Sequence, residues 1–195
     1  MSRGWRLAWL LAIALPGCAA PVVRPPPAPA VPAPVPVLAV PAAERIPAGQ
    51  RSAAIAGLEA ALKAALPSTD TLRLVAGTGQ PPSLVIDADR AFEVDSGQLK
   101  PALLLPLADA AAASRAGGAW VLHVVGRAPA ATDADLAERR AAAVRAYLGS
   151  RGIAEGRLRA EVRSGPARRV EVHFSPVVQG SEAQAWMPPA APAVR

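Results

Sequence analysis

Hydrophobic residues recur at helical spacing in two segments of the first two thirds of the chain. In residues 51–66 the apolar positions are Ile55, Leu58, Leu62 and Leu66. Pro67 follows directly and marks the end of this amphipathic helix. Residues 99–117 carry leucines at a similar spacing and end at a glycine pair. Pro106 lies inside this second segment, so we expect it to kink the helix or divide it into two pieces.

A third segment, residues 134–148, has the clearest helical pattern. Thr132 or Asp133 precedes it as a candidate N-cap, because a short oxygen-bearing side chain can accept hydrogen bonds from the free N–H groups of the first turn. Gly149 follows it as a candidate C-terminal stop.

Five short runs have the composition of β-strands. They are residues 71–76, 83–88, 120–125, 157–163 and 168–174. The run 120–125 is almost entirely apolar, which predicts a central strand. The last two runs alternate, with one apolar face made by Leu158, Ala160, Val162, Val170, Val172 and Phe174. We expect residues 77–82 and 164–167 to form hairpin turns.

These elements together predict an α+β fold in which helices pack on one face of a small mixed sheet as a two-layer sandwich. The chain is long enough for one such domain, which we place at residues 51–175. The Pro/Ala-rich residues 176–195 have no periodic pattern and are predicted to be a disordered tail.

The N-terminal residues 1–17 have the order of a secretory signal. Arg3 and Arg6 precede an apolar run that is too short to span a bilayer. The following Leu-Pro-Gly-Cys sequence resembles the lipobox of bacterial lipoproteins, which implies cleavage before Cys18 and lipid attachment to its thiol. The alternative is an ordinary secreted protein with a stray cysteine. In such lipoproteins an aspartate after the lipidated cysteine causes retention at the inner membrane. This chain has Ala19 at that position, so the resemblance favours location at the outer membrane.

Residues 18–50 form a lipid-anchored, Pro/Ala-rich linker in this interpretation. Its frequent prolines favour the extended polyproline II conformation. At about 3.1 Å per residue, roughly 30 residues could hold the domain on the order of 90 Å from the membrane. A tolerated low-complexity linker without such a role is the alternative.

Composition argues against several function classes. Removal of Arg3 and Arg6 with the signal lowers the formal charge from +6 to +4, which does not indicate nucleic-acid binding. A single cysteine can build neither a disulfide framework nor a Cys-rich metal site. His123 and His173 have no metal-ligand cluster around them, and Ser96 and Ser164 lack a recognisable base. We therefore expect neither an enzyme nor a cofactor.

Four stretches in a fixed order resemble the OmpA-like peptidoglycan-associated domain. Residues 92–101 match its Phe-x-x-x-Ser-x-x-Leu-x-Pro sequence, and residues 121–126 match the strand that ends in Gly-His-Thr-Asp. Residues 136–144 are similar to Leu-Ser-x-x-Arg-Ala-x-x-Val, and residues 168–172 to the end of Asn-Arg-Arg-Val-Glu-Ile. Lipobox, proline-rich linker and this domain together are the organisation of peptidoglycan-associated lipoproteins.

The resemblance implies non-covalent binding of the peptidoglycan stem, whose diaminopimelate carries a carboxylate and an ammonium group. Arg140 falls on the family's carboxylate-binding arginine, and it shares a helical stripe with two apolar residues. Alternatively, Arg140 extends to water or pairs with an internal acid such as Asp87 or Asp95. Asp133 could receive the ammonium group, or it could serve only as the helix N-cap.

The chain departs from the family at the acidic half of the site. Pro129 stands at the ligand-binding aspartate, Ala167 replaces the family asparagine, and the loop after Gly126 is short. These departures motivate a second hypothesis, in which a scaffold lipoprotein of an envelope or secretion complex has exchanged wall binding for a protein partner.

A basic face is predicted on the last two strands. Its members are Arg157, Arg159, Arg163 and Arg169, together with Glu161 and Glu171. A solvated surface is one interpretation, and an acidic partner or anionic lipid headgroups is the other.

Overall fold

The computed structural model describes residues 40–77 and 79–188. The predicted signal, the proposed lipidation site Cys18 and most of the predicted linker lie outside this part. Within it, no helix is both long and apolar enough to cross a membrane.

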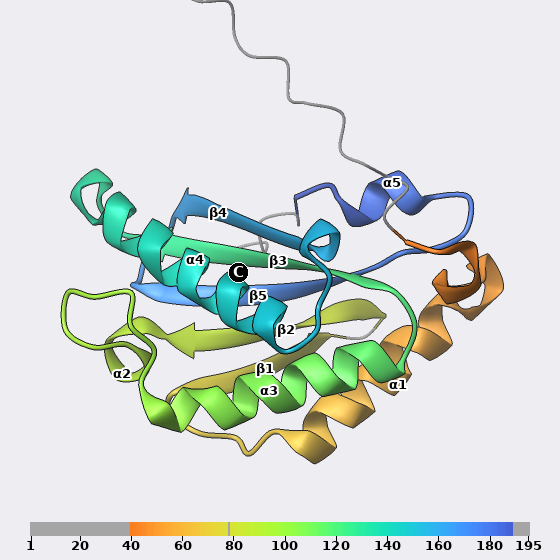
Figure 1. Ribbon diagram of the computed structural model, residues 1–195, viewed down its shortest axis with the longest axis horizontal. Helices are drawn as coiled ribbons and strands as arrows, with labels where there is room; N and C mark the ends of the chain where they lie inside the picture. Colours follow the sequence, from red (N-terminus) through yellow and green to blue (C-terminus); the bar gives the residue numbers. More distant parts are fainter. Residues whose placement is uncertain (1–39, 78, 189–195) are drawn as a thin grey trace, which may run out of the picture. The chain divides into compact units, whose positions relative to one another are not determined.

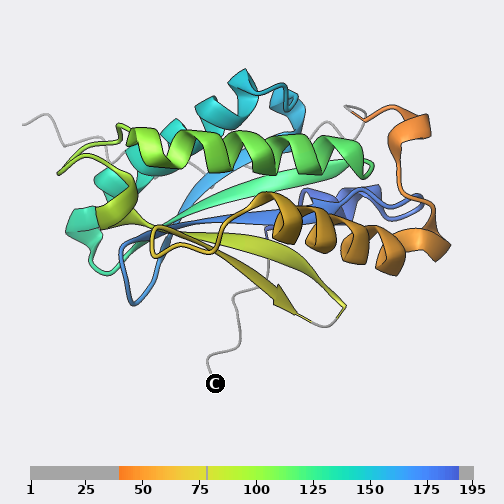
Figure 2. The same cartoon turned by 90° about the horizontal axis from the view of Figure 1, so that it is seen from below.

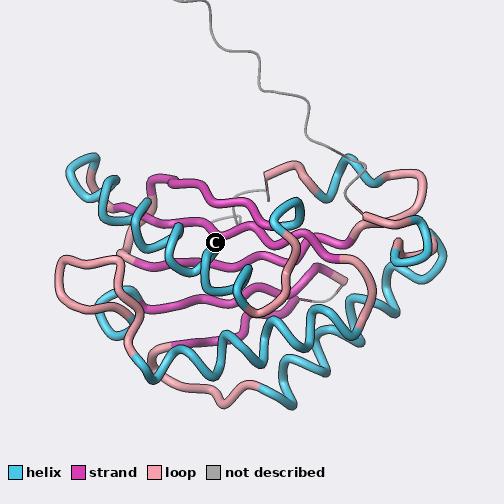
Figure 3. The backbone as a smooth tube through the Cα atoms, in the orientation of Figure 1, coloured by secondary structure: helices cyan, strands magenta, loops and turns pink. Residues whose placement is uncertain are grey.

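Five strands form one mixed sheet (Figure 3), in the order β1-β2-β5-β3-β4 that the labels of Figure 1 show. Their bounds are β1 Leu72–Gly77, β2 Gln80–Asp87, β3 Trp120–Ala128, β4 Leu158–Ser164 and β5 Arg169–Pro176. β3 pairs in parallel with β4 and antiparallel with β5, and the remaining pairs are antiparallel. The apolar run predicted as a central strand is therefore an interior strand, hydrogen-bonded on both sides.

Three long helices cover one face of this sheet (Figure 2). They are α1 Arg51–Ala65, α3 Pro101–Ala116 and α4 Ala134–Ser150, and the short helices are α2 Ala88–Ala91 and α5 Glu182–Ala185. Single 3₁₀ turns lie at Ala42–Glu44, Ala48–Gln50, Ala131–Asp133 and Glu155–Arg157. The predicted α+β class, with helices packed on a small mixed sheet, is confirmed.

The main core lies between the long helices and the sheet. Its largest side chains include Leu58, Leu62, Leu107, Leu122, Leu148, Phe92, Phe174 and Trp120, all almost fully buried. The apolar stripe predicted for α1 supplies Ile55, Leu58 and Leu62 to this core. Val170, Val172 and Phe174 of β5 face the same side, as their alternation predicted.

The last two strands do not form the predicted hairpin, because β3 lies between them. Strand β4 runs parallel to β3, and the chain then passes the end of β3, where Gly165 N–H donates to the carbonyl of Ala128 at 3.1 Å. Ala160, which was placed on the buried face, is exposed, whereas Leu158 of the same edge strand is buried. Local alternation predicts a strand but does not identify its neighbour.

The first hairpin has a shorter turn than predicted, and Pro81 and Pro82 lie inside β2. Strand β5 pairs with β2 only from Ser83 onward, so the N–H groups missing from both prolines are not needed on that side. On the other side, the pairing with β1 shifts register between Val75 and Gly77.

The helix ends also differ from prediction. Pro106 does not divide α3, which continues through it to Ala116 and lacks only the one backbone N–H that proline cannot supply. Gly149 lies inside α4, and the chain turns at Gly152, whose φ of +89° is a left-handed conformation that glycine adopts without strain.

A second, smaller core includes segments that were predicted to be linker and tail. Its members are Val40, Ala119, Val121, Val177, Ala185 and Trp186. Ile46 N–H donates to the carbonyl of Val177 at 2.9 Å, and Arg45 pairs with Glu182 at 3.0 Å. The packed domain therefore includes residues 40–50 and 176–188, and α5 covers part of the second sheet face.

Candidate binding site

Arg140 lies on the buried side of α4, and its side chain is only 5% exposed. Its Nε donates to the carbonyl oxygen of Ser96 at 3.2 Å, and its Nη1 lies 4.0 Å from Oδ1 of Asp89. The guanidinium carbon is 5.3 Å from the centre of the Phe92 ring. Arg140 is thus held against the segment that connects α2 with α3.

The acid closest to Arg140 is Asp89, which sequence reasoning did not find. Asp87, one predicted partner, instead caps α2 by accepting from the N–H groups of Asp89 and Arg90 at 3.1 and 3.0 Å. Asp95, the other predicted partner, acts on Arg140 only through its field. Asp89 is 51 positions away from Arg140 and has no periodic relation to it, so no sequence signal joins them.

Burial lowers the pKa of Arg140, because the charged guanidinium loses hydration. Asp89 and Asp95 raise this pKa, whereas Arg168 and Arg139 lower it. An arginine remains charged under these conditions. A partly compensated buried cation is a favourable place for an incoming carboxylate, which would supply the missing negative charge.

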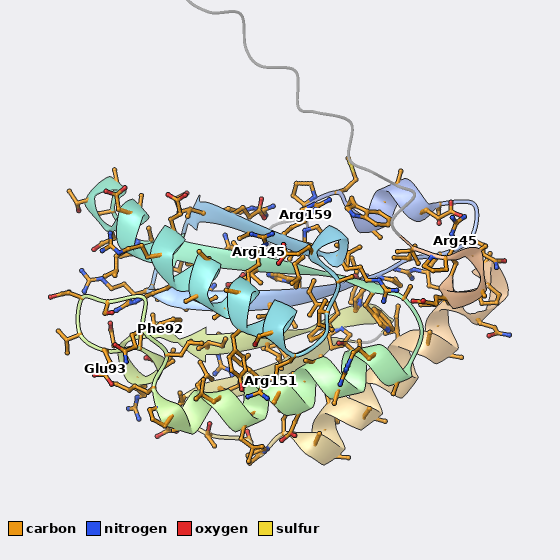
Figure 4. All side chains as sticks on the ribbon, in the orientation of Figure 1. Arg45, Phe92, Glu93, Arg145, Arg151 and Arg159 are labelled. Carbon is orange, nitrogen blue, oxygen red and sulfur yellow. The ribbon has the colours of Figure 1, made fainter. Side chains whose placement is uncertain are left out.

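Two glycines allow the backbone to approach α4 closely just before Arg140, at Ala137 and Arg139. A Cβ on Gly126 of β3 would lie 2.4 Å from the carbonyl oxygen of Ala137, and one on Gly97 would lie 3.0 Å from that of Arg139. Phe92 and Glu93, which belong to the segment between α2 and α3, are labelled in Figure 4. The glycines therefore fix the distance from α4 to the sheet and to the segment that receives Arg140.

Asp133 is the residue before α4, but its side chain makes no capping hydrogen bond, and neither does that of Thr132. Its carboxylate instead accepts from Nη2 of Arg168 at 2.8 Å. Asp133 therefore occupies the N-cap position, but the prediction that its side chain caps the helix is wrong.

Asp133 and Arg140, the two residues predicted to bind a ligand, line the same small cavity. Its volume is about 10 Å³, and its wall is made by Ala88, Arg127, Asp133, Leu136, Ala137, Arg140, Arg168, Arg169 and Val170. A space of this size holds about one water molecule. Pro129 is exposed beyond the end of β3 and does not line the cavity.

The opposite face of the sheet carries a buried ion network around Glu171. Its Oε2 accepts from Nε and Nη2 of Arg127 at 3.1 and 2.9 Å and lies 3.0 Å from Nε2 of His173. Its Oε1 accepts from Nε of Arg169 at 2.7 Å. Burial alone would raise the pKa of Glu171, but hydrogen bonds from His173, Arg127 and Arg169 lower it to about 2.

This network changes the interpretation of the predicted basic face. Alternation along β5 placed Arg169, Glu171 and His173 together, but it could not add Arg127, because the pairing of β3 with β5 was unknown. Arg157 lies in a turn before β4 and pairs with Glu44, and Arg163 pairs with Glu161 at 2.7 Å. Much of the predicted basic charge is therefore internally compensated.

His123 is buried, and its Nε2 lies 2.7 Å from the carbonyl oxygen of Ala185. Burial lowers its pKa, which favours the neutral ring. This contact attaches α5 to β3. Across residues 40–77 and 79–188, no three His, Cys, Asp or Glu side chains are grouped so that they could hold a metal ion.

Comparison with known proteins identifies relatives by structure only. No protein-family profile and no curated protein matches the sequence. A putative MotB like protein from Desulfovibrio vulgaris superposes with a TM-score of 0.53 at 15% identity, over 65% of this chain and 91% of that one. This likeness shows a shared fold.

Two further solved structures are similar at lower scores. The cell wall anchor of the type VI secretion system from Pseudomonas aeruginosa has a TM-score of 0.48 at 21% identity, over 63% of this chain and 96% of that chain. The OmpA-like domain of FopA1 from Francisella tularensis has a TM-score of 0.43 at 17% identity, over 54% of this chain and 80% of that chain.

Proposed function

We propose that this chain is a non-catalytic lipoprotein of the outer membrane that binds the peptide stem of peptidoglycan and so tethers the envelope to the cell wall. In this proposal Cys18 carries the lipid, the proline-rich linker spans the gap, and the domain faces the periplasm. The anchor rests on the sequence of residues 1–18 alone.

The observation that carries the proposal is the state of Arg140. Its guanidinium has five N–H donors and its side chain is almost fully buried, yet within residues 40–77 and 79–188 it makes one hydrogen bond, to Ser96, and one longer contact of 4.0 Å with Asp89. A stem carboxylate would accept the remaining donors in the bidentate geometry that arginine favours. Asp133 lines the same cavity and is the acid that an ammonium group would contact once the Arg168 side chain leaves it.

Sedimentation with purified peptidoglycan tests this proposal, using the mature protein without its lipid. We expect wild-type protein to be retained and Arg140→Ala to reduce the affinity at least about ten-fold, because hydrogen bonds to charged groups contribute about 1.5–3 kcal/mol. Arg140→Lys should bind weakly, because lysine keeps the charge but loses the planar fork.

Arg139→Ala is the matched control, since Arg139 is the exposed neighbour on the same helix and the change in charge is identical. Thermal unfolding of each variant separates loss of binding from loss of folding. Equal retention of wild type, Arg140→Ala and Arg139→Ala would contradict a site at Arg140.

A scaffold function is the second candidate, and the small volume of the cavity together with Pro129 favours it. In that case the domain contacts a protein of an envelope or secretion complex. Crosslinking in cells should then give protein adducts that persist after the wall is digested, whereas a wall-binding domain should be released by digestion.

A further inference from the structure

Both proposed ligand-binding residues already contact groups of their own chain, and the contact at Asp133 is the shorter one. Nη2 of Arg168 lies 2.8 Å from the Asp133 carboxylate, whereas Nη1 of Arg140 lies 4.0 Å from Asp89. Arg168 directly precedes β5, and its side chain is 48% exposed, while that of Asp133 is 18% exposed. The Arg168–Asp133 pair therefore lies at the solvent side of the cavity.

The guanidinium of Arg168 already makes the contact with the Asp133 carboxylate that a ligand's ammonium group would need. Both groups are cations that donate N–H bonds to a carboxylate, and among the residues that the structure describes Asp133 is the only acid that lines the cavity. Four arginines line it as well, but the guanidinium groups of Arg127 and Arg169 pair with Glu171 on the opposite face of the sheet. The field at Arg140 includes a repulsive contribution from Arg168. A further cation that enters this cavity would therefore find its one acid, Asp133, already paired.

We propose that Arg168 determines the specificity of this cavity by competing with the ammonium group of the ligand for Asp133. The cavity then favours stem ends that present a carboxylate alone over ends that also present an ammonium group. Binding of an ammonium group requires the side chain of Arg168 to leave Asp133, which also enlarges the cavity. This inference rests on the proposed function and specifies which stem chemistry the site accepts.

The backbone of Arg168 has a structural role that does not depend on its side chain, so the side chain can be substituted without removing that role. Its carbonyl accepts from Ala88 N–H at 3.3 Å and so joins β5 to the start of α2. A side-chain substitution leaves this bond in place. A partly exposed ion pair contributes little to stability, so Arg168→Gln should fold.

The test compares two synthetic stem peptides that end in diaminopimelate, one with a free side-chain amine and one with that amine acetylated. Calorimetry with the whole chain in detergent gives both affinities. Wild-type protein should bind the free-amine peptide no more tightly than the acetylated one. Arg168→Gln should bind the free-amine peptide about two- to five-fold more tightly than the acetylated one, which is the range expected from release of an exposed ion pair.

Two further variants assign the effect. Adding Asp133→Asn to Arg168→Gln should abolish the new preference, because no carboxylate remains for the ammonium group. Arg90→Gln is the matched control, since it breaks the exposed Arg90–Asp70 pair of 3.1 Å, which does not line the cavity.

The outcomes separate this inference from the proposed function. Binding that depends on Arg140, combined with an unchanged preference in Arg168→Gln, overturns the role of Arg168 alone. A preference that persists after Asp133→Asn also overturns it. Absence of binding to either peptide by every variant overturns both proposals.

Discussion

Glu171 is a buried acid on the sheet face that the long helices leave open. Its side chain is 4% exposed and contacts two arginines and a histidine. Its low pKa means that the folded protein holds the ionised form more strongly than the unfolded chain does. The stabilisation is therefore complete above about pH 4.5 and is lost as the pH falls toward about 2.

Glu171→Gln should lower the free energy of unfolding at pH 7 by about 3 kcal/mol, because the buried Arg127 and the half-buried Arg169 then keep their charges without a compensating anion. Close to pH 2 the same substitution should cost much less, since the wild-type carboxyl is then largely protonated. Urea unfolding at both pH values measures the difference.

Glu155→Gln is the control for this measurement, because Glu155 also pairs with an arginine, Arg145, but is exposed. We expect a change within about 0.5 kcal/mol there. An equal cost of Glu171→Gln at pH 7 and near pH 2 would show that the charge of Glu171 does not provide the stabilisation.

At the scale of elements, the position of α4 depends on Gly126. The carbonyl of Ala137 occupies the space that any side chain at this point of β3 would need. Since α4 also carries Arg140, the packing of one helix on one strand determines how far the guanidinium lies from the segment that contains Ser96.

Gly126→Ala should therefore lower the free energy of unfolding by about 1–3 kcal/mol through overpacking, and it should weaken retention on peptidoglycan as α4 shifts. Gly57→Ala is the opposite case, because Gly57 lies in α1 with nothing within 4 Å of an added Cβ. It should raise stability by about 0.5–1 kcal/mol through helix propensity. Chemical denaturation of the two variants measures both changes in the free energy of unfolding. An unchanged free energy of unfolding in Gly126→Ala would contradict the close approach of α4 to β3.

Elements with a periodic pattern could be predicted from the sequence, whereas their partners could not. Helix α1 and strand β5 bury the residues that their spacing indicated. The parallel pairing of β4 with β3 was missed, because two alternating segments joined by a short turn also fit a hairpin. Arg140 was identified through its match to the arginine of the OmpA-like sequence pattern, with its helical stripe as support. Asp89 was not identified, because its contact depends on how α2 packs against α4.

At the scale of the molecule, the segments that flank the predicted domain complete it. Residues 177–188 have no regular period, so their contribution could not be inferred from pattern. Trp186 and Val177 are nonetheless buried with Val40, and Gln179 N–H donates to the carbonyl of Ile46 at 2.9 Å. The segment before the predicted domain and the segment after it therefore bury each other's apolar side chains.

A protein limited to residues 51–175 should consequently be less stable than one of residues 40–188. We expect a loss of at least about 3 kcal/mol, the cost of removing a single large buried side chain such as Trp186. Thermal and urea unfolding of the two proteins measure it, and a version of residues 51–188 shows how much each flank contributes. Equal stability of all three would mean that the second core is not needed.

Residues 40–50 join the domain beside the first residue of β3 and the last residue of β5. Residues at the other ends of these two strands, which Figure 1 shows side by side, line the Arg140 cavity. Tension between a membrane anchor and a wall ligand would therefore run along the strands. The hydrogen bonds of an antiparallel pair lie perpendicular to the strands, so this load acts on them in shear. Bonds loaded in shear carry the force together rather than opening one after another, and such a sheet resists pulling along its strands.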